Sequence, residues 1–213
     1  MKKTAAEKAR TGTLRQYIKD DKIRLTDADR ALFSDLAKVR IVDEKDAGFH
    51  YENRKTPASK RLDRLAEAGI LKRVDVFQPE RGNFKAYQFA NKDVARIMGG
   101  KLPSIGSKRN ALHEVITSKL YYAVGRPDSF KLEADLSKDE KKLFSTMSVD
   151  GTSCLPDAVF YQGGQMVICE ADSGQYTSTQ IASKQAGWKG IKQVWGQPNV
   201  AAARVHNADV YRF

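Results

Sequence analysis

The spacing of apolar residues predicts two helices in the first fifty residues. Leu32, Leu36 and Val39 recur at helical spacing after Thr26, whose side chain suits an N-cap. A helix is therefore expected to begin just after Thr26. A second, shorter helix is predicted over 43–51.

A third helix and a β-hairpin are predicted next. The helix is expected to begin at Thr56-Pro57 and to stop at Gly69, because proline suits a first turn and glycine a helix end. Two strand-like runs follow, 72–77 and 84–89, and the loop 78–83 between them predicts a hairpin. Three helices followed by a hairpin are the order of elements in a winged-helix domain.

A segment rich in glycine, serine and proline, 99–107, is typical of a linker. It would separate an N-terminal domain (1–98, with a basic arm at its start) from a second domain over 108–213. The mixture of helical and strand patterns predicts an α+β fold. In the second domain, helices are expected over 107–124, from Ser137 and over 177–188, and strand-like runs over 130–133, 155–161, 166–172, 200–206 and 208–213. Because the last run ends the chain in a strand pattern, we expect truncation there.

The runs 155–161 and 166–172 are joined by a Gly163-Gly164 pair, a strong hairpin signal. A turn centred on that pair places Asp157 opposite Glu170. Two facing carboxylates repel each other and destabilise a hairpin, whereas a divalent cation between them reverses that effect. The pattern therefore predicts a metal site. The alternative is a pair of exposed acids, because such pairs are common and a register can slip by one residue.

The helix predicted after the hairpin adds a cation and an amide. Gln180 and Lys184 are four residues apart, so they project from one face of that helix. Acids that hold a metal, next to a lysine that offsets charge on a phosphoryl group, suit hydrolysis of a phosphodiester.

Composition indicates a folded protein with an anionic partner. The 213 residues are 41% hydrophobic and 30% charged, with a net charge of +11 and a pI of about 9.6. The two cysteines, Cys154 and Cys169, lie in apolar contexts and are expected to be reduced core residues. Because no apolar run is long enough to span a bilayer, we expect a cytoplasmic protein with no membrane partner.

The excess of positive charge lies mainly in the first half, where the third helix is strongly basic. We expect Leu62, Leu65 and Ile70 to be buried and Lys60, Arg61 and Arg64 to point outward. The alternative is a solvated helix that contacts nothing. The residues predicted to contact double-stranded DNA are Lys55, Ser59, Lys60, Arg61, Arg64, Arg81 and Lys85.

The second domain resembles the PD-(D/E)xK restriction-endonuclease-like fold, with a mixed central sheet. A winged helix followed by Pro156-Asp157, Glu170-Ala-Asp172-Ser-Gly174 and Gln180…Lys184 is similar to the replication-relaxation family, which includes the MobC-type plasmid relaxases. The resemblance covers roughly 25–213. It implies that Asp157 and Glu170 hold Mg²⁺ or Mn²⁺ and that Lys184 supplies the positive charge.

Three positions leave the implied roles open. Asp172 stands where most members of the superfamily carry lysine, so it could be a ligand, an orienter of Lys184 or a sign of lost chemistry. Glu114 stands where the first helix of the fold often contributes an acid and is a candidate metal ligand, although an exposed glutamate fits as well. His113 could be a base, but a structural role is favoured.

The resemblance implies a plasmid mobilization relaxase, a metal-dependent endonuclease that nicks one DNA strand at a transfer origin. Other relaxase families attack DNA with tyrosine, but aromatic residues on a helix usually pack, so Tyr121, Tyr122 and Tyr176 are not expected to act as nucleophiles. The main alternative is a DNA-binding regulator or relaxosome accessory protein with an inert nuclease-like domain. A restriction-type nuclease that cuts both strands is a third. Relaxosome accessory and coupling proteins are expected partners.

Overall fold

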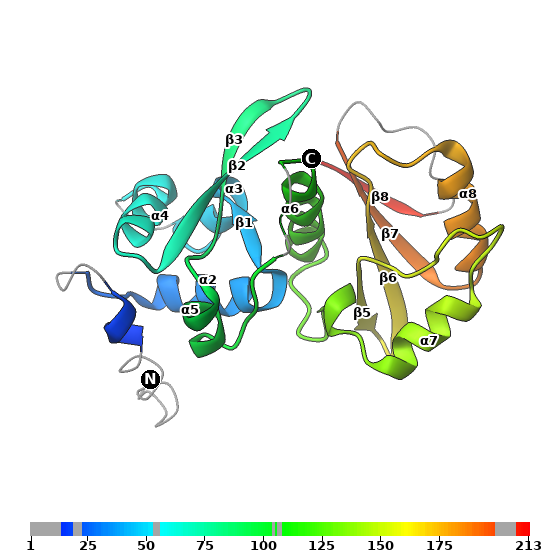
Figure 1. Cartoon of the computed structure of the whole chain (residues 1–213), viewed down its shortest axis with the longest axis horizontal. Coiled ribbons are helices and arrows are strands. Elements are labelled where there is room, and N and C mark those ends of the chain that lie inside the picture. The colour runs from blue at the N-terminus through cyan, green and yellow to red at the C-terminus, as the bar shows by residue number, and fades with distance from the viewer. Residues whose placement is uncertain (1–13, 19–22, 53–55, 104, 106–107, 199–207) are drawn as a thin grey trace. The chain divides into compact units, whose positions relative to one another are not determined.

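The computed structural model describes residues 14–18, 23–52, 56–103, 105, 108–198 and 208–213. These residues form mixed α and β structure with seven α-helices and two sheets (Figure 1). They divide into unit 1, residues 1–77 and 83–111, and unit 2, residues 78–82 and 112–213. The division falls inside helix α6 (Lys108–Ala123), just beyond the predicted linker. Within the described ranges, no helix has the length and apolar character needed to cross a bilayer.

The helices of unit 1 begin where their capping residues predict. Thr26 and Asp29 form a capping box at the start of α2 (Asp27–Val39), each side chain bonding to the backbone of the other. The helix α4 (Ala58–Glu67) ends before Gly69, which adopts a positive φ of 77°. The remaining helical elements of the unit are the 3₁₀ turn η1 (Arg15–Tyr17), α3 (Glu44–Gly48) and α5 (Lys92–Ile97).

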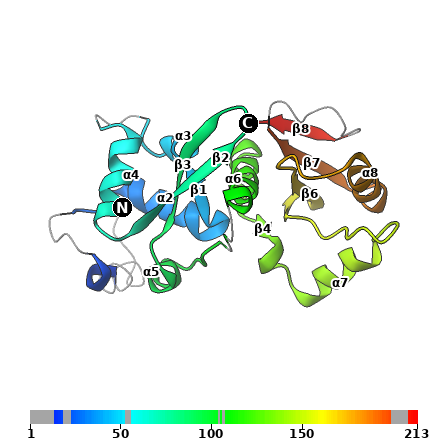
Figure 2. The same ribbon diagram turned by 45° about the horizontal axis from the view of Figure 1, so that its top comes forward.

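Unit 1 contains a three-stranded sheet in the order β1-β3-β2 (Figure 2). Strands β2 (Leu71–Gln78) and β3 (Gly82–Phe89) are the predicted hairpin, with longer strands and a shorter turn than expected. The predicted burial of Leu62, Leu65 and Ile70 is confirmed. Strand β1 (Ile41–Asp43) pairs antiparallel with β3 and was not predicted, because three residues are too few for a sequence period.

Unit 2 is built on a mixed five-stranded sheet in the order β4-β5-β6-β7-β8. Its strands are β4 (Lys131–Leu132), β5 (Ala158–Gln162), β6 (Gln165–Ala171), β7 (Lys192–Gln197) and β8 (Asp209–Arg212). The pairs β4–β5 and β5–β6 are antiparallel, whereas β6–β7 and β7–β8 are parallel. A 3₁₀ turn η2 (Glu133–Asp135) follows β4, and α7 (Lys138–Thr146) and α8 (Ser178–Gly187) complete the unit.

The predicted register of the β5–β6 hairpin is confirmed. Gly163 and Gly164 form the turn with φ of 58° and 79°, and Val159 pairs with Ile168. Pairing by this register leaves Asp157 and Glu170 facing each other beyond the last paired residues.

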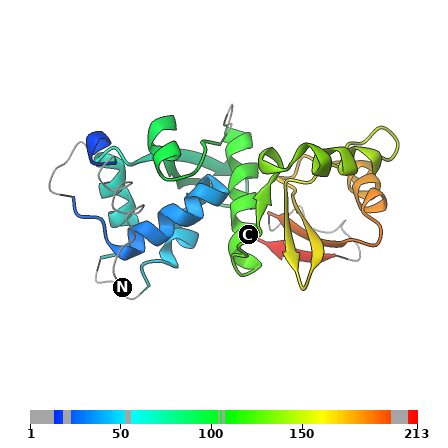
Figure 3. The ribbon, with the colours of Figure 1, turned by 90° about the horizontal axis from the view of Figure 1, so that it is seen from below.

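Helices cover both faces of this sheet (Figure 3). On one face, Val159 and Ile168 pack with Trp195 of β7, Phe144 of α7 and Trp188 just after α8. On the other face α6 approaches β7 closely. A Cβ added to Gly196 would lie 2.7 Å from Cγ2 of Ile116 and 2.9 Å from Cγ of Leu120. Only glycine therefore lets α6 sit this close to the sheet.

The two cysteines are buried and unbonded to each other, as predicted. The predicted run 200–206 and Lys55 lie outside the described residues. Strand β7 was missed because its buried side chains include glutamines: Gln193 donates to the carbonyl of Trp188 and Gln197 donates to Asp172. Internal hydrogen bonds allow polar residues in a buried strand, which hides the apolar pattern.

Candidate active site

Asp157 and Glu170 meet at the end of the hairpin opposite the glycine turn. The backbone N–H of Asp157 donates to Oε2 of Glu170 at 3.4 Å, and the backbone N–H of Ala171 donates to Oδ2 of Asp157 at 2.7 Å. The side chain of Asp157 is 13% exposed, whereas that of Glu170 is completely buried. The structure thus brings the two predicted acids together.

Lys184 reaches Glu170 from α8. A capping box between Thr177 and Gln180 fixes the start of that helix. Two turns later Nζ of Lys184 lies 2.5 Å from Oε1 of Glu170 and donates to the carbonyl of Leu155 at 3.3 Å. The predicted lysine therefore contacts one of the two predicted acids directly.

Two aromatic rings hold the lysine in place. Nζ of Lys184 lies 5.2 Å from the ring centre of Tyr176 and 5.1 Å from that of Trp188, distances at which an aromatic ring attracts a cation. The Tyr176 hydroxyl donates to Oε1 of Glu170 at 2.6 Å. Tyr176 and Lys184 therefore share one oxygen of the buried acid.

Asp157, Glu170, Tyr176 and Lys184 form a cluster in which the pKa values of Glu170 and Tyr176 are shifted. Burial raises the pKa of Glu170, and the nearby charge of Asp157 raises it further, while Lys184 and Tyr176 oppose the rise. Burial and the negative charges of Glu170 and Asp157 also raise the pKa of Tyr176 far above its usual 10. Tyr176 is thus a neutral phenol that donates a hydrogen bond, which disfavours the phenolate that a tyrosine nucleophile needs.

His113 of α6 also belongs to this cluster. The sequence alone favoured a structural role for it. Its Nε2 lies 2.9 Å from Oδ1 of Asp157. Burial lowers the pKa of His113, but the hydrogen bond to Asp157 and the charge of that carboxylate outweigh burial and raise the pKa to about 9. At neutral pH a protonated imidazole therefore faces Asp157. The only sequence signal for it was a histidine on the helix before the acidic hairpin.

Asp172 and Gln180 have hydrogen bonds that shape the loop before α8. Asp172 is buried, and its carboxylate accepts from the backbone N–H of Gly174 at 2.8 Å and from the side chain of Gln197 at 3.3 Å. Gln180 accepts from the backbone N–H of Thr177 at 2.9 Å. The contacts of Asp172 are those of a residue that orders the β6–α8 loop, rather than those of a metal ligand.

A cavity of about 440 Å³ opens beside the cluster. Asp157, Tyr176, Gln180 and Lys184 line it, and the buried Glu170 contacts two of these residues, Tyr176 and Lys184. The other lining residues are Glu133, Gly151, Thr152, Ser153 and Leu155. Glu133 was not predicted, although its backbone N–H donates to the carbonyl of Asp157 at 2.7 Å.

The predicted ligand set of Asp157, Glu170 and Glu114 is not assembled. Among the described residues, no three His, Cys, Asp or Glu side chains are arranged to hold a metal ion. Glu114 is half-buried on α6 and does not line the cavity. Asp157 and Glu170 alone still fit Mg²⁺, which usually takes one or two carboxylates and completes its shell with water and substrate phosphate.

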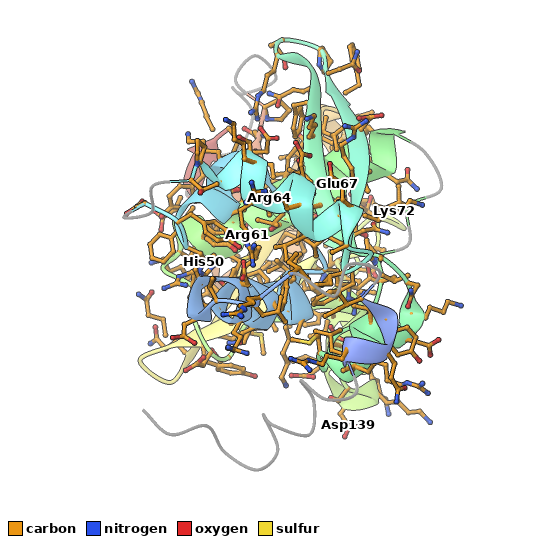
Figure 4. All side chains as sticks on the ribbon, turned by 90° about the vertical axis from the view of Figure 1, so that its left-hand side faces the viewer. His50, Arg61, Arg64, Glu67, Lys72 and Asp139 are labelled. Atoms are coloured by element: carbon orange, nitrogen blue, oxygen red, sulfur yellow. The ribbon has the colours of Figure 1, made fainter. Side chains whose placement is uncertain are left out.

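Part of the predicted DNA-binding set is exposed to solvent, including Arg64 on α4, which is labelled in Figure 4. Lys60, Arg64 and Arg81 are exposed. Ser59 is half-buried, and the half-buried Lys85 lies 3.6 Å from the carboxylate of Asp63.

The expectation that Arg61 points outward is wrong. Its guanidinium binds both oxygens of Asp29, at 2.9 Å and 2.6 Å, and donates to the carbonyl of Arg24 at 2.8 Å. Asp29 is fully buried and also accepts from the hydroxyl of Tyr51 at 2.9 Å. A buried carboxylate without a cation would be strongly destabilising. Pairing Arg61 with Asp29 is therefore more favourable than leaving the arginine in solvent.

Comparison of the chain with models of protein families, with curated proteins and with solved structures finds no match.

Proposed function

We propose that this chain is a metal-dependent DNA endonuclease that nicks one strand, acting as a plasmid mobilization relaxase. In this proposal unit 1 is a winged-helix DNA-binding domain and unit 2 is a PD-(D/E)xK nuclease-like domain. The single observation that carries the proposal is the convergence of Asp157, Glu170 and Lys184 beside a cavity. Two acids on neighbouring strands and a lysine from the next helix are suited to cleaving a phosphodiester.

The residues of the cluster would divide the work. Asp157 and Glu170 would hold Mg²⁺ or Mn²⁺, which supplies Lewis-acid polarisation of the phosphate and a more acidic water. Lys184, which lines the cavity, would offset the negative charge that builds up on the phosphoryl oxygens. Gln180 lies one helical turn before Lys184 and could donate its amide to the same phosphate.

Unit 1 would supply the affinity for duplex DNA. The order of α2, α3 and α4 followed by the β2–β3 hairpin supports a winged-helix domain. Lys60 and Arg64 on α4 would contact phosphates, and so would Arg81 in the hairpin turn, which is counted with unit 2. Relaxosome accessory and coupling proteins would assemble on the same DNA.

One observation favours a second function, a DNA-binding accessory protein with an inert second domain. The carboxylate oxygens of Asp157 and Glu170 already have protein partners, among them His113, Lys184 and Tyr176. A metal would have to displace Lys184 or Tyr176 from Glu170, whereas each oxygen of Asp157 keeps a second lone pair that can reach a metal beside its hydrogen bond. The two functions therefore differ in whether Glu170 is released to bind a metal.

Incubation of supercoiled plasmid with the chain, with and without Mg²⁺ or Mn²⁺, tests the proposal. Open-circular product that requires the metal is expected. Asp157→Asn and Glu170→Gln should each lower its rate by at least about 100-fold, because metal activation is worth several kcal/mol. The matched control Asp209→Asn changes an exposed acid of the same sheet and should nick at the wild-type rate.

The product also separates the alternatives. Linear DNA from the outset would indicate a restriction-type nuclease, and nicking at the parental rate by both acid variants would refute the metal site. Activity should survive Tyr176→Phe. A denaturant-resistant protein–DNA adduct that disappears in Tyr121→Phe, Tyr122→Phe or Tyr176→Phe would replace hydrolysis with covalent attack. DNA binding without nicking would favour the accessory protein.

A further inference from the structure

Helix α6 has a fixed seat on the sheet of unit 2. Ile116 and Leu120 are buried, and both lie against the bare backbone of Gly196 on β7. A helix pressed on the sheet without an intervening side chain has little freedom to slide. The residues of α6 are therefore held at a defined distance from the strands.

His113 lies one turn before Ile116, so the packing of α6 on the sheet places its side chain next to the hairpin. Its Nε2 is 2.9 Å from Oδ1 of Asp157, while Oδ2 of the same carboxylate accepts from the backbone N–H of Ala171. The two oxygens of Asp157 are thus held by two different elements, α6 and β6. One such bond alone would leave the carboxylate free to turn about its Cβ–Cγ bond.

Asp157 is also the acid of the pair that lines the cavity, because Glu170 is fully buried. Any group that fixes the direction of the Asp157 oxygens therefore determines which of them faces a ligand in the cavity. Catalytic groups lose much of their effect when they are displaced by an ångström.

We infer that His113 is a positioning residue that fixes the carboxylate of Asp157 for strand cleavage at the cavity. The inference rests on the proposed function and adds to it a residue from a third element. Partners of this kind orient ligating carboxylates without touching the substrate.

Two substitutions of His113 separate positioning from other roles. His113→Ala removes the bond to Asp157, so kcat for nicking and the affinity for Mn²⁺ should each fall by about 10- to 100-fold, with KM for plasmid unchanged. His113→Gln places an amide nitrogen near the position of Nε2 and should restore both to within about threefold of wild type. Mn²⁺ affinity is measured by calorimetry without DNA.

A thermal unfolding cycle on the metal-free chain gives a readout that needs no activity. His113→Ala should lower the unfolding midpoint by roughly 3–8 °C in the wild-type background and by less than about 2 °C when Asp157 is already alanine. Equal shifts in the two backgrounds would mean that the two side chains are not coupled, which overturns the inference.

The remaining outcomes are also decisive. The wild-type chain could nick DNA while His113→Ala keeps the same nicking rate and the same Mn²⁺ affinity. That result overturns the inference and leaves the proposed function intact. A glutamine variant as impaired as the alanine variant, or a change confined to KM, overturns it as well, since neither fits a hydrogen bond that orients Asp157. Absence of nicking in the wild-type chain is a failure of the proposed function, and the cycle and Mn²⁺ affinity then still decide whether His113 holds Asp157.

Discussion

Each unit of the protein contains a fully buried carboxylate that binds one cation and one tyrosine hydroxyl, yet the two acids behave in opposite ways. The partners are Arg61 and Tyr51 for Asp29 in unit 1, and Lys184 and Tyr176 for Glu170 in unit 2. Asp29 has a pKa below its usual value and Glu170 a pKa above it. The contact distances alone do not distinguish them.

The surroundings explain the difference. Burial raises the pKa of Asp29, but hydrogen bonds from Arg61 and Thr26 outweigh it and hold the pKa low. Glu170 faces a second acid, Asp157, whose charge adds to the effect of burial. Among the described residues, no second acid thus offsets the hydrogen bonds of Asp29, whereas the protonation of Glu170 depends on burial and on the charge of a neighbouring acid together.

The largest expected effect is on the ion pair of unit 1. Arg61→Ala should lower the free energy of unfolding by about 3–5 kcal/mol, because it leaves Asp29 buried without its cation. Urea unfolding followed by circular dichroism measures the loss. Arg64→Ala, an exposed arginine of the same helix, should stay within about 0.5 kcal/mol of wild type. Equal losses of unfolding free energy in the two variants would contradict a structural role for Arg61.

The second acid of unit 2 can be tested through His113. The pKa of His113, about 9, should fall toward its ordinary 6.5 in Asp157→Asn, because the hydrogen bond to Asp157 and the charge of that carboxylate are lost while burial still lowers the pKa. Histidine ring resonances in NMR report it, and His113→Gln assigns the signal.

The sign of the accompanying pH dependence follows from the raised pKa of His113. Because the folded chain holds this proton more tightly than the unfolded chain, the stabilisation is complete below about pH 6.5 and is lost as the pH rises through about 9. Asp157→Asn should flatten this part of the stability profile. A profile that declines equally in both chains would contradict the pairing.

Lys184→Met should cost less than Arg61→Ala, about 1–2 kcal/mol at pH 8. Glu170 has a raised pKa, so it can take up a proton when its cation is lost, which Asp29 cannot do near neutral pH. The loss should be smaller at pH 6 than at pH 8, because protonation of Glu170 is easier there.

Tryptophan fluorescence suits this measurement, because Trp188 lies against the lysine. Lys189→Met changes an exposed lysine just after α8 and is the matched control. A loss that does not change between the two pH values would mean that Glu170 stays ionised.

The smallest effects are expected at the exposed cations of unit 1. If unit 1 binds duplex DNA as proposed, Arg64→Ala should weaken that binding severalfold and reduce the slope of log affinity against log salt by about 1, because the proposed phosphate contact of Arg64 is lost. Fluorescence anisotropy over a salt series measures both. Lys138→Ala, an exposed lysine on α7, is the control. An unchanged slope in Arg64→Ala would exclude α4 as a phosphate-binding element.

The sequence predicted what local patterns determine. The Gly163-Gly164 turn set the register that brings Asp157 to Glu170, and helical spacing placed Lys184 on a helix that follows at once. Caps such as Thr26 marked where helices begin. In each case the signal lies within a few residues of the feature.

Contacts between distant residues were beyond such patterns. His113 meets Asp157 across 44 positions, and Arg61 meets Asp29 across 32. A basic amphipathic helix looks the same in sequence whether its arginine faces DNA or a buried carboxylate. Local patterns therefore placed Asp157, Glu170 and Lys184 near one another, but they did not reveal the contacts that His113 makes with Asp157 and Arg61 with Asp29.

Gly196 shows how far from the charged residues the cluster can be disturbed. This glycine has no side chain and carries no charge, yet one added methyl group would press on Ile116 and Leu120 and push α6 away from the sheet. His113 lies on α6, so its hydrogen bond to Asp157 depends on position 196 of the neighbouring strand being a glycine. Evolution could thus silence or retune this cluster through a single uncharged position while every acid, lysine and histidine stays in the sequence.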